Sequence, residues 1–111
     1  MHIAVCDDDE ISRICILKLL SEYASLHKNI SLSFSAFSNP EALLDVAEKV
    51  DGFDIYILDI VMPKMNGIEL GIKLRNQGYD GSIIYLTSST DFAIDSYKAE
   101  ACGLGYLSAS P

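Results

Sequence analysis

Four aspartates follow two apolar segments, and together they could hold a hard cation. Asp7, Asp8 and Asp9 stand directly after the first apolar segment, and Asp59 ends the apolar run 55–58. Two carboxylates 4 Å apart repel each other by about 4 kcal/mol at an effective dielectric constant near 20. A cation, a proton or water must relieve that repulsion. Mg²⁺ suits this chemistry because it takes carboxylates, waters and a phosphate as oxygen ligands.

Strands and helices are expected to alternate along the chain. Hydrophobic periodicity and turn residues predict strands at about 2–6, 31–36, 54–58, 82–86 and 104–107. The same signals predict helices at about 10–26, 40–50, 67–77 and 91–100. This alternation indicates a single α/β domain with a parallel sheet, and right-handed crossovers place helices on both of its faces.

Local patterns distinguish the edge of the sheet from its centre. Residues 31–36 alternate between polar and apolar side chains, as in an edge strand, whereas 54–58 is apolar throughout and suits a central strand. Ser38 and Glu41 fit a capping box, with Pro40 in the first turn of the helix that follows. The second helix is therefore expected to begin directly after the edge strand.

Polar residues follow the carboxyl ends of three predicted strands. Open α/β sheets bind ligands outside those ends, where the strand order reverses. Asp7 to Asp9, Asp59 and Thr87 occupy such positions, so three separate strands direct polar groups at one crevice. Taken singly, the residues have plainer explanations, because Asp9 fits a helix N-cap and Thr87 an ordinary turn residue.

The combined pattern is more specific than its parts. An acidic pair follows the first strand, Asp59 is followed one residue later by Val-Met-Pro-x-Met-x-Gly, and a threonine follows the fourth strand. This combination resembles the receiver domain of bacterial two-component response regulators over essentially the whole chain, 1–111. The Cys-Asp-Asp opening and the segment Tyr85-Leu86-Thr87-Ser88 most resemble receivers of LytTR-type regulators. The resemblance implies a flavodoxin-like fold, a doubly wound five-stranded parallel sheet with strand order 2-1-3-4-5.

The resemblance also implies a role for each acid. Asp59 would be the phosphoacceptor, whose carboxylate attacks the phosphoryl group of a sensor histidine kinase or of a small phosphodonor. Asp8 and Asp59 would ligate Mg²⁺ directly, together with the backbone carbonyl of Val61, and Asp7 would act through a metal-bound water. The cation would neutralise charge on the phosphoryl oxygens, because phosphoryl transfer depends mainly on positioning and electrostatics.

A switch and a loop complete the implied site. Thr87 would hydrogen-bond a phosphoryl oxygen, and Tyr106 would enter the space that the inward movement of Thr87 leaves. Outside this motif, Tyr106 would be an ordinary half-buried strand aromatic. Pro63 is expected to fix the loop after Asp59, and Gly67 to allow a left-handed turn into the next helix. The resemblance thus implies a phosphoacceptor with self-phosphorylation and self-dephosphorylation only, and not a turnover enzyme.

The carboxyl-terminal part departs from the family pattern. Receivers carry a lysine just before a proline at the end of the fifth strand, and here Ala109 or Ser110 occupies that place. Lys64 and Lys98 are the remaining basic candidates, and both are more readily explained as solvated side chains. The chain also stops before a fifth helix, so we expect a C-terminally truncated receiver domain, or a homodimer in which a second copy covers the bare surface.

The composition of the chain limits the kinds of partner and the compartment that can be expected. The 111 residues carry a formal net charge of −8, which repels phosphate backbones, so no direct nucleic acid binding by this segment is expected. No apolar run is long enough to span a membrane and no export signal is visible, which favours the cytoplasm. The three cysteines lack metal-ligand spacing and fit small core residues in a reducing compartment. The implied partners are a sensor histidine kinase and a DNA-binding output domain outside this chain.

Other functions remain open on the sequence alone. The missing lysine allows a receiver-like interaction or dimerisation module that does not signal by phosphorylation. A Mg²⁺-dependent phosphatase also uses a strand-end aspartate, but its Asp-x-Asp-x-Thr pattern is absent at Asp59. A dinucleotide-binding domain is disfavoured because the first strand leads into aspartates and not into a Gly-x-Gly-x-x-Gly turn.

Overall fold

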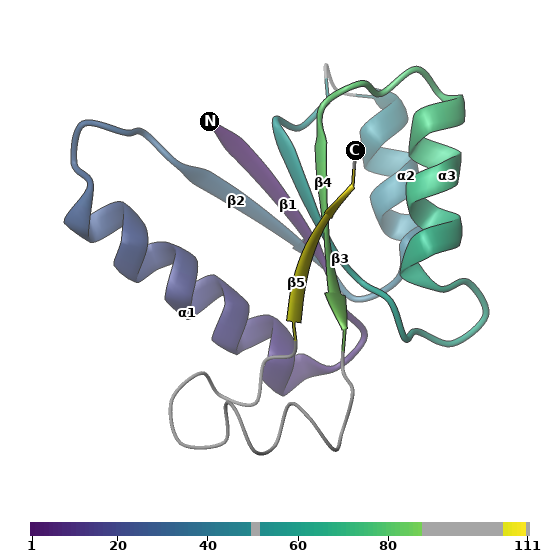
Figure 1. Cartoon of the computed structure of the whole chain (residues 1–111), viewed down its shortest axis with the longest axis horizontal. Coiled ribbons are helices and arrows are strands. Elements are labelled where there is room, and N and C mark those ends of the chain that lie inside the picture. The colour runs from purple at the N-terminus through teal and green to yellow at the C-terminus, as the bar shows by residue number, and fades with distance from the viewer. Residues whose placement is uncertain (50–51, 88–105, 111) are drawn as a thin grey trace.

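A five-stranded sheet organises the chain (Figure 1). The computed structural model describes residues 1–49, 52–87 and 106–110, with the backbone alone for Thr87 and for 106–110. The strands are β1 (His2–Cys6), β2 (Ser33–Phe37), β3 (Ile55–Asp59), β4 (Ser82–Thr87) and β5 (Tyr106–Ser110). The helices are α1 (Glu10–Leu26), α2 (Pro40–Lys49) and α3 (Gly67–Asn76). The strand order is β2-β1-β3-β4-β5, as predicted.

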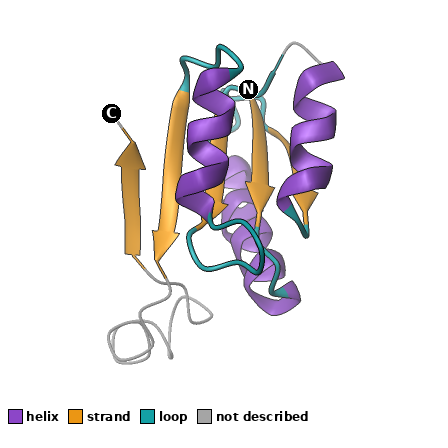
Figure 2. Cartoon of the chain, turned by 90° about the vertical axis from the view of Figure 1, so that its right-hand side faces the viewer, coloured by secondary structure: helices purple, strands orange, loops and turns teal. Residues whose placement is uncertain are grey.

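The helices cover both faces of the sheet. In Figure 1, α1 lies on one side of the strands, and α2 and α3 lie side by side on the other. Figure 2 shows α2 and α3 in front of the sheet and α1 behind it. Among the described residues, no helix combines the length and the apolar composition that crossing a membrane requires. The predicted doubly wound α/β fold is confirmed for this part of the chain.

The last strand runs opposite to the predicted direction. The other four strands are parallel neighbours, but β5 pairs antiparallel with β4, with Thr87 opposite Tyr106 and Ile83 opposite Ser110 (Figure 2). The prediction of a fully parallel sheet is therefore wrong for β5. An antiparallel neighbour starts at the edge where the preceding strand ends, so it needs no crossover to the far edge. The helix expected at 91–100 lies outside the described residues.

Two apolar layers fill the space between the sheet and the helices. Along β1, Ile3 and Val5 belong to the cluster that includes Ile16 of α1, whereas Ala4 and Cys6 belong to the cluster under α2 and α3. Successive strand side chains point to opposite faces, so both faces of β1 are buried. The central strand β3 is buried almost throughout, and the edge strand β2 is not, which agrees with their sequence patterns.

Side-chain caps set where the helices begin. Asp9 is the N-cap of α1 and accepts a backbone hydrogen bond at 2.8 Å, as its plainer explanation anticipates. At α2 the capping oxygen belongs to Asn39, which accepts from the Ala42 N–H at 2.8 Å. The predicted cap at Ser38 is wrong, because α2 begins at Pro40 and the residue directly before the first helical position supplies the cap.

The contact between Gly71 and Tyr85 tests the packing of α3 against β4. A Cβ at Gly71 would collide with the Tyr85 hydroxyl, so Gly71→Ala should lower the free energy of unfolding by about 1–2 kcal/mol, despite the higher helix propensity of alanine. Tyr85→Phe should cancel most of that loss in the double variant. Urea denaturation followed by circular dichroism measures both effects, and an equal loss in the two backgrounds would show that the collision is not the cause.

Candidate metal centre

Three carboxylates meet at the carboxyl ends of β1 and β3. These strands are parallel neighbours, with Cys6 paired to Leu58, so the residues that follow this pair lie at one edge. Ligand oxygens of Asp7, Asp8 and Asp59 lie within 4.8 Å of one another. Asp7 is 4% and Asp59 7% exposed, whereas Asp8 is exposed. The predicted acidic cluster therefore forms, with two buried carboxylates and one exposed carboxylate.

Backbone hydrogen bonds hold Asp7 at its place. Its N–H donates to the carbonyl of Phe37 at 3.1 Å, and its Oδ1 accepts from the Asp9 N–H at 2.9 Å. Its own carbonyl accepts from Nη1 of Arg13 at 2.8 Å. Asp7 is thus fastened to β2, to the start of α1 and to a side chain of α1, which fixes the loop that carries Asp8.

The loop after Asp59 is fastened in a similar way. The Ile60 N–H donates to the carbonyl of Leu86 at 3.0 Å, which ties the loop to β4. The Val61 N–H donates to Oδ1 of Asp59 at 3.3 Å, so the Val61 peptide lies beside the acidic cluster. The carbonyl of Pro63 accepts from the Met65 N–H at 2.8 Å, which closes the tight turn in which Pro63 was predicted.

Gly67 serves the site by its small size. The sequence suggested a left-handed turn at this glycine, but the positive φ in this loop, 69°, belongs to Lys64. A Cβ at Gly67 would collide with the backbone carbonyl of Asp59, and the Gly67 N–H donates to the carbonyl of Ile60 at 2.9 Å. The expected role is therefore corrected: a glycine is required here because α3 starts directly against the end of β3.

Burial and mutual repulsion keep protons on the cluster. Burial, followed by the charges of Asp7 and Asp8, raises the pKa of Asp59 to about 7, although the Val61 N–H opposes this shift. Burial also raises the pKa of Asp7. The pKa of the Cys6 thiol, buried beneath the site, is raised to about 12 by burial and by the charge of Asp7. At neutral pH the site therefore retains a proton or attracts a cation, and Cys6 is not a nucleophile.

The donor set fits a magnesium ion. Mg²⁺ binds oxygens at about 2.0–2.1 Å in an octahedron, so ligands on opposite sides lie roughly 4 Å apart. Carboxylate oxygens of Asp7, Asp8 and Asp59 lie within 4.8 Å of one another, close enough to hold one such ion directly or through its waters. All three are hard oxygen donors, and the exposed Asp8 leaves the site open to water and to a phosphate.

Thr87 and Tyr106, the two residues predicted to form a switch, are paired through their backbones. Asp59 pairs with Leu86, so Thr87, the next residue, lies at the same edge of the sheet as the acids. Thr87 is paired in turn with Tyr106 of β5. Ala109, one candidate for the position of the missing lysine, lies opposite Ile84, farther from that edge. The antiparallel direction of β5 therefore separates this position from the acidic cluster.

Arg13 is a basic residue of the site that the sequence reasoning missed. The sequence suggested Lys64 and Lys98 as basic residues of the site. Lys64 is exposed in its loop, and Lys98 lies outside the described residues. The side chain of Arg13 instead reaches back to the carbonyl of Asp7. The available signal was its position in the first turn of α1, four residues after Asp9, where a cation is unfavourable for the helix dipole.

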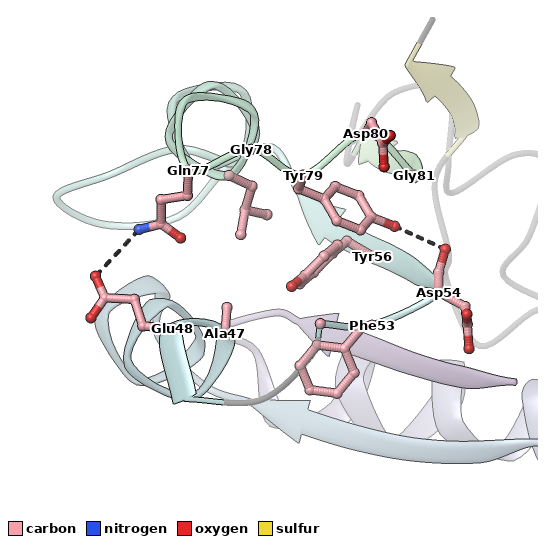
Figure 3. Close-up of a pocket in the computed structure, with 12 residues that line it drawn as sticks. Ala47, Glu48, Phe53, Asp54, Tyr56, Gln77, Gly78, Tyr79, Asp80 and Gly81 are labelled. Carbon is pink, nitrogen blue, oxygen red and sulfur yellow. Dashed lines mark hydrogen bonds between the residues drawn. The ribbon is translucent and has the colours of Figure 1, made fainter.

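A separate hollow lies at the opposite end of the sheet (Figure 3). It has a volume of about 680 Å³ and lies between the end of α2 and the loop before β4. Phe53, Tyr56 and Tyr79 contribute aromatic rings to it, and Glu48 accepts a hydrogen bond from Gln77 at 3.5 Å beside it. None of the clustered carboxylates lines this hollow, so it is distinct from the metal centre.

Comparison with known proteins agrees with this combination of fold and strand-end acids. The response regulator receiver domain family model matches residues 3–107. The chain therefore belongs to the response regulator receiver domain family, which makes it part of two-component signalling.

Individual relatives support the same assignment. The chain is 25% identical over 108 residues to accessory gene regulator protein A of Staphylococcus aureus strain N315, covering 96% of this chain but 45% of that protein. It is 24% identical to the protein of the same name in Staphylococcus epidermidis, again covering 45% of its length. The chain thus spans less than half of these relatives. The similarity agrees with the predicted resemblance to LytTR-type regulators.

Solved structures resemble the chain in fold and in sequence. Response regulator TrrA from Thermotoga maritima, in complex with Mg²⁺ and beryllium fluoride, has a TM-score of 0.67 and 27% identity over 86% of this chain and 76% of that one. The response regulator RcsB, solved in complex with DNA, has a TM-score of 0.65 and 26% identity over 90% of this chain and 48% of that one.

The raised pKa of Asp59 predicts a pH-dependent stability. A carboxyl with a raised pKa binds its proton more tightly in the folded state, so stability falls as pH rises from 3.8 to about 7. Asp59→Asn should therefore raise the free energy of unfolding at pH 8 by about 1–3 kcal/mol, and change it little at pH 4. Urea denaturation in the presence of a metal chelator measures this change, and Asp45→Asn, at an exposed position of α2, is the control. An increase in the free energy of unfolding that is the same at pH 4 and pH 8 would show that the raised pKa of Asp59 is not its cause.

Proposed function

We propose that this chain is the phosphoacceptor domain of a two-component response regulator, with Asp59 as the acceptor. The observation that carries the proposal is the gathering of Asp59 with Asp7 and Asp8, whose ligand oxygens lie within 4.8 Å of one another. A buried carboxylate at the carboxyl edge of a parallel sheet, beside two further acids, offers both a nucleophile and a cation site. The phosphoryl donor is a phosphohistidine on a sensor histidine kinase, or a small acyl phosphate.

The transfer requires one bond to form and one to break. An oxygen of the ionised Asp59 carboxylate attacks phosphorus, and the bond from phosphorus to the donor imidazole breaks. The nitrogen leaves with the electron pair, and the product is an acyl phosphate on Asp59. The Val61 N–H donates to Oδ1 of Asp59, which orients the carboxylate and favours its ionised form. One phosphoryl group is accepted per chain, so the domain is a switch and not a turnover enzyme.

The remaining acids hold the cation that this reaction needs. Asp8 and Asp59 would ligate Mg²⁺ directly with the carbonyl of Val61, and Asp7 would contribute through a water. The ion supplies positive charge against the phosphoryl oxygens. The exposed Asp8 and the adjacent Val61 loop leave the ion accessible, while the buried Asp7 is held by its backbone bonds. Binding of Mg²⁺ and beryllium fluoride is known for the similar TrrA.

Thr87 and Tyr106 would transmit the phosphorylation state. The hydroxyl of Thr87 would donate to a phosphoryl oxygen, and Tyr106 would respond to the movement. Their backbone pairing supports this coupling, because a shift of one strand end acts directly on the other. The signal would pass to a DNA-binding output domain beyond this chain, in the cytoplasm. This segment itself, with its net charge of −8, would not bind nucleic acid.

One observation favours a second function, a receiver-like interaction or dimerisation module without phosphorylation. The family lysine is replaced by Ala109 or Ser110, and these residues pair with Ile84 and Ile83 away from the acids. A phosphoryl group on Asp59 would then lack its usual ammonium partner. Phosphorylation would be slower or its effect weaker, and docking to a second copy would become the main role.

Phosphorylation can be tested directly by mass. Incubation with acetyl phosphate and Mg²⁺ should add the mass of one phosphoryl group to the wild-type chain, and Asp59→Asn should abolish the adduct because the nucleophile is lost. Chelating the metal should reduce the adduct by at least about tenfold. Asp45→Asn, at an exposed position of α2, is the matched control and should be labelled normally. An undiminished adduct in Asp59→Asn would sink the proposal.

The switch can be tested without a kinase. Beryllium fluoride with Mg²⁺ should increase amide-exchange protection by about tenfold across the paired ends of β4 and β5, and Thr87→Val should remove most of this increase because the hydroxyl donor is lost. Asp59→Asn should show no response. If beryllium fluoride leaves protection and oligomeric state unchanged in the wild type, the interaction-module function is the better description.

A further inference from the structure

Arg13 makes a contact that the proposed chemistry leaves unexplained. It lies in the first turn of α1, where its backbone N–H donates a helical hydrogen bond to the carbonyl of Asp9 at 3.0 Å. Its side chain turns back toward β1, and Nη1 donates to the carbonyl of Asp7 at 2.8 Å. The bond is partly buried. Arg13 therefore ties the first turn of α1 to the end of β1, across the loop that contains Asp8.

The position carries an electrostatic cost, and its surroundings offset that cost. A positive side chain near a helix N-terminus is disfavoured by the helix dipole. Here the guanidinium bonds the carbonyl of Asp7, the first of three consecutive acids, and it attracts the carboxylate of Asp9. The hydrogen bond of Arg13 goes to a backbone carbonyl and not to a carboxylate of the cluster. The arrangement thus holds the backbone of the loop and keeps the carboxylate oxygens available.

We infer that Arg13 is a positioning residue for the metal centre, an inference that rests on the proposed function. By holding the Asp7 carbonyl, Arg13 keeps the side chains of Asp7 and Asp8 facing Asp59 against their mutual repulsion. Its side chain bonds a backbone carbonyl, so it would act through the ligands and not as one of them. Groups that orient metal ligands from outside the coordination sphere change metal affinity strongly when they are removed.

The direction in which Mg²⁺ affinity changes when Arg13 is replaced distinguishes a positioning role from a purely electrostatic one. If Arg13 acted only through its positive charge, removing it would strengthen Mg²⁺ binding, because like charges repel. If it holds the ligands in place, removing it weakens Mg²⁺ binding even though the site becomes more negative. Arg13→Met keeps the length of the apolar stem and removes both the charge and the donor, so the two effects predict opposite changes.

Arg75 provides a matched control in the same chain. Its Nη1 also donates to backbone carbonyls, those of Tyr79 and Gly81, at 3.2 and 2.6 Å. These residues line the hollow at the opposite end of the sheet. Arg75→Met therefore removes the same net charge and a comparable clamp, far from the acids. Arg13→Lys restores the charge and a single donor without the planar guanidinium.

The experiment combines calorimetric Mg²⁺ titration with amide exchange of the metal-free protein. We expect Arg13→Met to weaken Mg²⁺ binding by about tenfold and to lower the protection of the Asp9 amide, which bonds Oδ1 of Asp7, by a similar factor. Arg75→Met should change neither quantity. Arg13→Lys should recover part of both losses, as a partial replacement of the donor requires.

Two results would overturn the inference. Mg²⁺ binding that is unchanged or tighter in Arg13→Met would remove the positioning role, and so would unchanged protection of the Asp9 amide. Failure of the wild-type chain to bind Mg²⁺ would instead count against the proposed function. The amide-exchange measurement needs no metal, so it still decides whether Arg13 holds the Asp7–Asp9 loop.

Discussion

The repulsion among Asp7, Asp8 and Asp59 is the constraint on which the site depends. Their ligand oxygens lie within 4.8 Å of one another, and two of the three side chains are buried. Such a cluster is unfavourable by itself, since burial and like charges both resist ionisation. The fold tolerates it because β1 and β3 are rigid parallel neighbours with apolar layers on both faces. A bound cation would relieve the same unfavourable charge.

Backbone bonds, more than side-chain pairs, hold this arrangement. Asp7 is tied to β2 through Phe37, and the loop after Asp59 is tied to β4 through Leu86. Gly67 lets α3 begin directly against the end of β3, where any side chain would collide with the Asp59 carbonyl. Within the part of the chain that the structure describes, no lysine or arginine forms a salt bridge with these carboxylates. A preorganised set of acceptors needs little rearrangement when a cation and a phosphoryl group arrive.

The edge formed by β4 and β5 lies beside the acidic cluster. Thr87 and Tyr106 pair at the end of this edge that lies beside the acids. Ala109 pairs with Ile84 farther along the strands, so the position of the family lysine is separated from the site. If Asp59 accepts a phosphoryl group as proposed, the metal would have to neutralise more of its charge, because no lysine lies at that position of the sequence.

Residue patterns alone predict the α/β alternation and the gathering of Asp7, Asp8 and Asp59, because periodicity and strand-end position are local signals. The strand order followed from the resemblance to receiver domains and is confirmed by the sheet. Four features became evident only in the folded chain: the direction of β5, the cap at Asn39, the steric role of Gly67 and the contact of Arg13 with Asp7. The direction of β5, the packing of Gly67 and the reach of Arg13 depend on where one element lies against another. The cap depends on which residue precedes the first helical position. Local residue patterns carry little information about such placements, since the same residues suit several of them.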